Sequence, residues 1–187
     1  SHELHARLLA DADIKGELIV LSAQSDAFRA VTEITIYTPD HPGLFSKLAG
    51  AIAVSGGSIV DAKAFTTSDG FALDVFSVQD AEGGPFGESE RIKRLRQTIE
   101  KTLSGEISPK KVLAERPIRK RARAFKVAPR VGFDNNASTT ATVIEVEGLD
   151  RQGFLYDVTQ ALFESGLSIS SSIVATYGER AVDVFYV

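Results

Sequence analysis

The chain contains an internal repeat, and a segment that begins near residue 40 recurs 110 residues later. The matching pairs before the first hairpin are Leu48/Val158, Ala51/Ala161, Ile52/Leu162, Ser55-Gly56/Ser165-Gly166 and Ser58-Ile59/Ser168-Ile169. After the hairpin the offset becomes 109, so that Asp74-Val75-Phe76 matches Asp183-Val184-Phe185. Loss of one residue in the second hairpin turn explains the change. Self-similarity of this length predicts that one folding unit has been duplicated.

Each copy has a turn between a predicted strand and a predicted helix. Turn 1 consists of Asp40, His41, Pro42, Gly43, Leu44 and Phe45, and turn 2 consists of Asp150, Arg151, Gln152, Gly153, Phe154 and Leu155. Both turns place a carboxylate and a glycine near a helix N-terminus. Proline suits the first turn of a helix, where its missing N–H is no loss, but turn 2 has Gln152 in that position.

The first copy reads as strand, helix, strand, strand, helix and strand. Residues 32–37 alternate between apolar and polar, and the helix that follows ends at Gly56-Gly57. Two alternating runs, 58–66 and 71–78, flank a hairpin turn. A second amphipathic helix spans 92–103, and after a polar connector over 106–121 the last strand is expected within 125–133.

These elements predict an α+β chain with two βαββαβ units in tandem. We expect the first unit at residues 31–134 and the second at 135–187. Because Val187 follows the third strand of the second copy, that unit is expected to lack its last helix and strand. Residues 1–30 are expected to be a connector from an upstream domain, with a helix and a short strand at 18–21.

Composition excludes several classes of function. The chain has 187 residues, of which 43% are apolar, and this is enough to bury a sizeable core. No run approaches the length of a membrane span and no signal peptide opens the chain, so we expect a cytoplasmic protein without membrane contact. With no cysteine and three histidines, we expect neither catalytic residues nor a metal site.

The order of strand, Asp-x-x-Gly turn, helix, Ser-Gly and hairpin resembles the ACT domain, a ferredoxin-like module that typically binds amino acids. The local motifs resemble the C-terminal tandem ACT region of the bacterial PII uridylyltransferase/uridylyl-removing enzymes. The segments that carry this resemblance are turn 1, Ser58-Ile59-Val60-Asp61-Ala62, Asp134-Asn135-Asn136-Ala137-Ser138, Val143-Ile144-Glu145-Val146 and Arg180-Ala181-Val182-Asp183-Val184-Phe185-Tyr186-Val187.

The resemblance implies a non-catalytic regulatory module that senses L-glutamine. It implies upstream nucleotidyltransferase and HD hydrolase domains in the same chain, the PII protein as a partner through the parent enzyme, and an association of ACT units that could form a homodimer. No cofactor is implied for this segment, whereas the parent enzyme would use magnesium and UTP. In this family turn 2 usually has proline where this chain has Gln152.

Turn 1 and turn 2 are the candidate ligand-binding residues. A helix N-terminus favours the carboxylate of an amino acid, and Asp40 and Asp150 could accept hydrogen bonds from its ammonium. In ACT modules the ligand usually lies between this turn and the second strand of the neighbouring unit. The resemblance therefore implies a second tier of candidates: Ser58, Ile59, Val60, Asp61, Ser168, Ile169, Ser170 and Ser171.

Other interpretations stay open at this point. The module could serve a different amino-acid-regulated enzyme, or it could be a structural dimerisation module without a ligand. Asp40 and Asp150 could be simple helix caps. Asp74 and Asp183 are expected to be solvated or to face a sheet edge. The basic segment 116–126 could suggest nucleic-acid binding, but the central strands lack a platform of aromatic side chains, so we expect no nucleic-acid partner.

Overall fold

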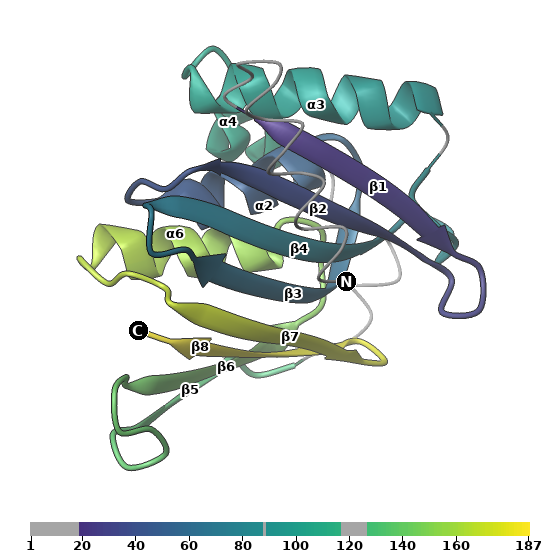
Figure 1. Cartoon of the computed structure of the whole chain (residues 1–187). Coiled ribbons are helices and arrows are strands. Elements are labelled where there is room, and N and C mark those ends of the chain that lie inside the picture. The colour runs from purple at the N-terminus through teal and green to yellow at the C-terminus, as the bar shows by residue number, and fades with distance from the viewer. Residues whose placement is uncertain (1–18, 88, 117–126) are drawn as a thin grey trace.

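The computed structural model describes residues 19–87, 89–116 and 127–187 and contains two similar α+β units (Figure 1). The helix predicted over residues 2–12 and the basic residues 117–126 lie outside the described residues. The elements of the first unit are β1 (Val20–Asp26), β2 (Val31–Pro39), α2 (Leu44–Val54), β3 (Ser58–Thr66), β4 (Phe71–Gln79), α3 (Ser89–Leu103) and α4 (Pro109–Ala114). Those of the second are β5 (Arg130–Asp134), β6 (Val143–Leu149), α6 (Phe154–Glu164), β7 (Ser171–Tyr177) and β8 (Arg180–Tyr186).

Each unit has its own antiparallel sheet of four strands. The order is β1-β2-β4-β3 in the first sheet and β5-β6-β8-β7 in the second. This is the strand arrangement of tandem ferredoxin-like ACT units, as the sequence predicts. The predicted strands at 32–37, 58–66 and 71–78 are confirmed by β2, β3 and β4 within about two residues.

The prediction for the fourth strand of the first sheet was wrong. That position is taken by β1, which precedes the unit and pairs with β2, whereas β5 pairs with β6 in the second sheet. The reason is a local hairpin: the Asp26 carboxylate accepts hydrogen bonds from the N–H groups of Phe28 and Arg29, both at 3.0 Å. Such an Asx turn closes a strand pair over a few residues, without the long loop that the predicted strand required.

The same hairpin recurs in the second unit, where the Asp134 carboxylate accepts from the N–H groups of Asn136 and Ala137. The second sheet therefore has all four strands, contrary to the expectation that it lacks its last one. The described second unit does not contain counterparts of α3 and α4. Strand pairing thus assigns residues 20–26, predicted as connector, to the first unit and residues 130–134 to the second.

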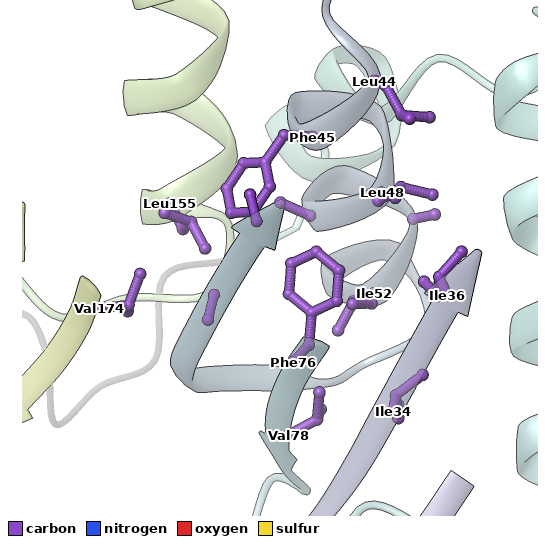
Figure 2. Close-up of a cluster of buried hydrophobic side chains, with 14 of the residues drawn as sticks. Ile34, Ile36, Leu44, Phe45, Leu48, Ile52, Phe76, Val78, Leu155 and Val174 are labelled. Atoms are coloured by element: carbon purple, nitrogen blue, oxygen red, sulfur yellow. The ribbon is translucent and has the colours of Figure 1, made fainter. Parts of the chain in front are cut away.

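The two units share one hydrophobic core (Figure 2). In the first unit Phe45 of α2 packs on Phe76 of β4, with ring centroids 5.4 Å apart. Leu155 of α6 and Val174 of β7 belong to the same buried cluster although they come from the second unit. The units are therefore packed as one body, which buries apolar surface that each alone would expose to water.

The units meet side by side along β3 and β7, the edge strands of the two sheets (Figure 1). Helices α2 and α6 also pack against each other, and the Ser46 hydroxyl donates a hydrogen bond of 2.9 Å to the side-chain oxygen of Gln160. The two ACT units therefore pair within one chain. In the part of the chain that the structure describes, no helix is long and apolar enough to cross a membrane.

Candidate functional site

The pairing of the units forms two clefts that are equivalent by the repeat. Cleft 1 lies between turn 1, with Asp74 of β4, and the second unit's Phe163, Leu167, Ser168 and Ile169. Cleft 2 lies between turn 2, with Asp183 of β8, and the first unit's Ala53, Gly57, Ser58 and Ile59. These second-unit and first-unit walls occupy matching positions of the repeat. Each cleft therefore needs both units.

The structure brings four of the second-tier candidates to the turns. Ser168 and Ile169 line cleft 1, and Ser58 and Ile59 line cleft 2. Val60 instead lines a wide groove beside turn 2, which it shares with Arg151 and α4.

The other three second-tier candidates line neither cleft. The carboxylate of Asp61 lies 3.9 Å from the guanidinium of Arg29. The Ser170 hydroxyl donates to the backbone oxygen of Tyr186, and Ser171 pairs with the same residue across the sheet. These three residues have structural contacts and no place in the clefts.

Asp40 and Asp150 are not helix caps. Helices α2 and α6 have Gly43 and Gly153 at the N-cap, and neither helix has a side-chain cap hydrogen bond. The Asp40 carboxylate instead accepts a hydrogen bond of 2.9 Å from the Thr66 hydroxyl of β3. The first N–H of each helix is bonded within the turn, from Leu44 to the His41 oxygen and from Phe154 to the Arg151 oxygen. The next N–H groups of the first turn have no side-chain acceptor from the cap, and such groups favour an anion.

The glycines of the turns are required by the backbone and by close packing. Gly43 and Gly153 have φ angles of 78° and 84°, in the left-handed region that disfavours other residues. A Cβ at Gly43 would lie 3.3 Å from the ring of Phe163, and one at Gly153 would lie 3.0 Å from Leu113 of α4. Each turn therefore touches an apolar side chain of another element, and turn 2 is backed by α4.

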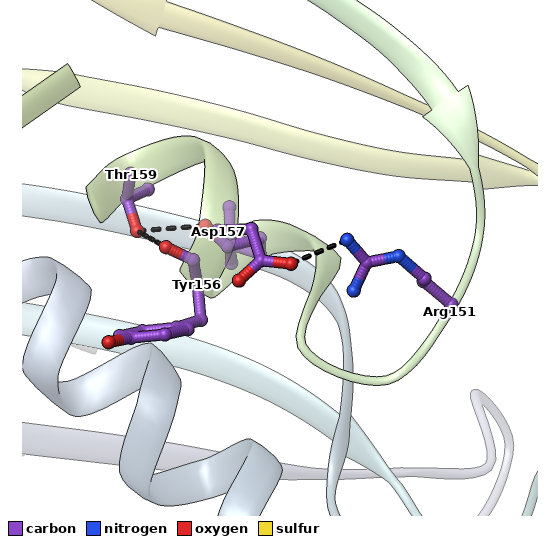
Figure 3. A network of polar contacts seen from close by, with 5 residues as sticks. Arg151, Tyr156, Asp157 and Thr159 are labelled. Carbon is purple, nitrogen blue, oxygen red and sulfur yellow. Dashed lines mark hydrogen bonds and ion pairs between the residues drawn. The ribbon is translucent and has the colours of Figure 1, made fainter. Parts of the chain in front are cut away.

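Arg151 and His41 have local contacts. Arg151 forms an ion pair with Asp157 in the first turn of α6, and the Thr159 hydroxyl donates to the backbone oxygens of Leu155 and Tyr156 (Figure 3). His41 is exposed, and its Nδ1 lies 3.1 Å from the backbone oxygen of Pro42. Both residues shape the turns, and within the described ranges no cluster of three or more His, Asp or Glu could hold a metal ion.

The expectation for Asp74 and Asp183 was wrong, because both side chains are buried. Asp74 is 2% exposed and lines cleft 1, and Asp183 is 0% exposed and lines cleft 2. Burial, with a smaller effect of Asp40, raises the pKa of Asp74 to about 8. Burial, with a smaller effect of Asp150, raises the pKa of Asp183 to about 7. Each cleft therefore has a buried acid that a cation would stabilise in its charged form.

A signal for these two acids is present in the sequence. Side chains alternate along a strand, so Asp74 lies on the same face as Phe76 and Val78, both of which are core residues. Asp183 and Phe185 have the same relation in the second copy. An acid that the duplication repeats on the core face of a strand is a better candidate than its polarity alone suggests.

The two clefts differ in size. Cleft 1 has a volume of about 250 Å³, near the lower end of ligand pockets in general. Cleft 2 has about 20 Å³, which is room for about one water molecule. The side chain of Gln152 crosses to α2, where its Nε2 donates a hydrogen bond of 2.9 Å to the backbone oxygen of Ala53. Of these two clefts in the described part of the chain, cleft 1 is the one with room for an amino acid.

Comparison with known proteins finds relatives that match almost the whole chain but are several times longer than it. It is 54% identical over 172 residues to a bifunctional uridylyltransferase/uridylyl-removing enzyme of Azospirillum brasilense, and 50% identical over 189 residues to that of Rhodospirillum rubrum. This chain is homologous to a segment of these enzymes. The matches cover 90% and 100% of the chain but only 18% and 20% of the relatives.

Two further comparisons add little. No protein-family model matches the chain. Among solved structures, an aspartate kinase from Synechocystis aligns with 84% of this chain over 24% of the kinase chain, with a TM-score of 0.43 and 15% sequence identity. That similarity is too low to support an argument about fold or function.

Proposed function

We propose that the chain is an amino-acid-sensing regulatory module and that it binds L-glutamine in cleft 1. Within a longer uridylyltransferase/uridylyl-removing enzyme, glutamine would favour removal of uridylyl groups from the PII protein over their transfer to it. Transfer and removal would be carried out by parts of the enzyme outside this segment. The observation that carries the proposal is the buried acid Asp74 beside Asp40 in a cleft that both units line.

The ammonium of the ligand would bind to the acidic end of cleft 1. Asp74 and Asp40 lie close enough for the charge of Asp40 to raise the pKa of Asp74, and a cation between them relieves that repulsion. An ammonium has three donors, which suits two carboxylates that supply several acceptor positions.

The carboxylate of the ligand would bind to the first turn of α2. Leu44, Phe45 and Ser46 line cleft 1, and helix N-termini bind anions through their free N–H groups and the helix dipole. The side-chain amide would then extend toward the wall that Ser168 and Ile169 form, where a hydroxyl and backbone groups can pair with both a donor and an acceptor.

Regulation would follow from the position of the cleft between the units. A ligand that touches turn 1 and the second unit at once has a different affinity for each arrangement of the pair. Binding therefore shifts the population toward the arrangement with higher affinity, and the shift is reciprocal for any domain that senses it. Association of two chains into a homodimer through their ACT units stays a prediction.

A titration of the chain with amino acids tests the proposal. L-glutamine at 100 times its dissociation constant should raise the free energy of unfolding by about 2.7 kcal/mol, seen as a thermal shift. Glutamate, serine, threonine, lysine and phenylalanine serve as competitors. Asp74→Asn should abolish the shift, whereas Asp69→Asn, in the exposed hairpin turn, should leave it unchanged. A shift with another amino acid but none with glutamine would point to a different regulated enzyme, and no shift at all would favour a purely structural role.

A further inference from the structure

The two clefts have the same origin in the repeat but differ at one position of the turn. Turn 1 has Pro42, whose ring contains no hydrogen-bond donor, and turn 2 has Gln152. The residues across from them also differ, since cleft 1 is walled by Phe163 and cleft 2 by Ala53. The small alanine leaves room for the side chain of Gln152 to reach the helix, which a phenylalanine at that position would occupy.

The amide of Gln152 has a well-defined partner. Its Nε2 donates to the backbone oxygen of Ala53, the same oxygen that accepts a hydrogen bond of 2.9 Å from Nη1 of Arg116. Ala53 lies in the last turn of α2, and its backbone oxygen also accepts a hydrogen bond of 3.0 Å from the N–H of Gly56. The contact of Gln152 therefore joins turn 2 of the second unit to the C-terminal end of α2 in the first.

Cleft 2 contains a buried carboxylate, that of Asp183, at the position that Asp74 has in cleft 1. Both of its carboxylate oxygens are buried and, among the described residues, neither has a hydrogen-bond partner. Buried polar groups in folded proteins are nearly always paired, so this acid lacks the partner that its environment calls for. Cleft 2 thus retains the buried acid of an amino-acid site, but its volume of about 20 Å³ excludes an amino acid.

We propose that Gln152 is a built-in ligand of cleft 2, and that its side chain and terminal amide occupy the space between turn 2 and α2 that a free amino acid would otherwise enter. This inference rests on the proposed function, because it assigns to cleft 2 the same ligand chemistry as to cleft 1. Gln152 carries the same two methylenes and terminal amide as glutamine itself. Of the two clefts among the described residues, cleft 1 would then take a free amino acid, and cleft 2 would be filled by a side chain of the protein itself.

Removal of the Gln152 side chain would open cleft 2 rather than only enlarge it slightly. The wide groove beside turn 2 has a volume of about 890 Å³. Gln152 lines both this groove and cleft 2, as do Ser58, Asp150, Arg151 and Thr176. Without the Gln152 side chain the two spaces would join, and the acidic end at Asp183 would become accessible to an ammonium from the groove.

The number of glutamine molecules bound per chain tests the proposal, and isothermal titration measures it directly. The unmodified chain should bind one glutamine, and Asp74→Asn should weaken this binding at least 30-fold. Gln152→Ala should bind two, and Gln152→Pro, which gives turn 2 the residue of turn 1, should do the same. Adding Asp183→Asn to Gln152→Ala should return the number to one. Circular dichroism of each variant checks that the fold is intact.

The reciprocal change supplies an independent readout. Pro42→Gln places a side-chain amide in turn 1, where Phe163 occupies the position that Ala53 has in cleft 2. Glutamine should therefore still bind at cleft 1, with one molecule per chain and an altered affinity. Two molecules per unmodified chain would overturn the inference, as would one molecule in both Gln152 variants. In either case the proposed function would stand. Absence of binding in every protein would reject the proposed function and this inference with it.

Discussion

At the scale of single residues, the informative positions are two acids buried in the core. Asp74 and Asp183 occupy matching places on β4 and β8, in a part of each sheet that faces apolar side chains. Such acids lower stability when charged, so a function that needs the charge accounts for their presence more simply than packing does. Sequence reasoning treated them as solvated because it considered their polarity and not the alternation that puts Asp74 beside Phe76.

The pKa of Asp74 predicts how stability depends on pH. Its ordinary value is 3.8 and burial raises it to about 8, so between these limits the folded chain holds a proton that the unfolded chain has lost. The stability that this proton on Asp74 contributes to the folded chain is fully present below about pH 4, and it is lost as the pH rises to about 8. Each pH unit in this window lowers the free energy of unfolding by up to about 1.4 kcal/mol.

Asp74→Asn should therefore flatten the pH dependence, because an amide stays neutral throughout. Urea denaturation at several values between about pH 5 and pH 8 measures the slope, and Asp69→Asn, exposed in the hairpin turn, is the matched control. Asp183→Asn should act in the same direction with an upper limit of about pH 7, since burial raises the pKa of Asp183 to about 7. An unchanged slope in Asp74→Asn would show that the acid is charged and hydrated in the folded chain.

At the scale of elements, the turns and the helices that follow them were predictable, and the partners of the edge strands were not. Gly43 and Gly56 mark the start and end of α2 in the sequence, because local backbone geometry requires glycine there. The fourth strand depends on whether β1 or a later segment pairs with β2, and both segments contain short apolar runs that can form a strand. Helix α4 was missed because six residues with two lysines resemble a polar connector.

Gly43 offers a test of turn 1 as an element of the site. Gly43→Ala forces a left-handed backbone on alanine, at a cost of about 1–2 kcal/mol, and brings its Cβ to 3.3 Å from Phe163. Gly166→Ala has the same φ of 78° with no atom within 4 Å, so it should lose a similar amount of stability. Only Gly43→Ala should also weaken glutamine binding, as measured by titration. If the two variants bound glutamine equally well, turn 1 would not be part of the glutamine site.

At the scale of the whole molecule, the shared core makes the two units one cooperative structure. Leu155 and Val174 complete a cluster that otherwise belongs to the first unit, and β3 and β7 meet at its edge (Figures 1 and 2). The repeat in the sequence showed that there are two units, but duplication is equally compatible with pairing within a chain and between chains. The choice depends on apolar complementarity between distant segments, which hydrophobic periodicity does not encode.

Leu155→Ala tests this cooperativity. The side chain is 6% exposed, and its truncation should lower the free energy of unfolding by about 2–5 kcal/mol in a single urea transition. Amide hydrogen exchange should become faster in β2 and β4 of the first unit as well as in the second unit, where the substitution lies. Ile173→Ala, at 52% exposure on β7, should change stability by about 0.5 kcal/mol or less. Two separate transitions, with only the second one shifted, would mean that the units unfold independently.

The hairpin that places β1 at the edge of the first sheet also defines what was copied when the repeat arose. Strands β1 and β5 begin at residues 20 and 130, which differ by 110, the same offset that relates the two turns. The repeated segment therefore includes the edge strand, so that each copy carries all four strands of its own sheet. Recombination that cuts between Ala114 and Arg130 would leave both sheets whole, whereas a cut near residue 30 would separate a strand from its own sheet.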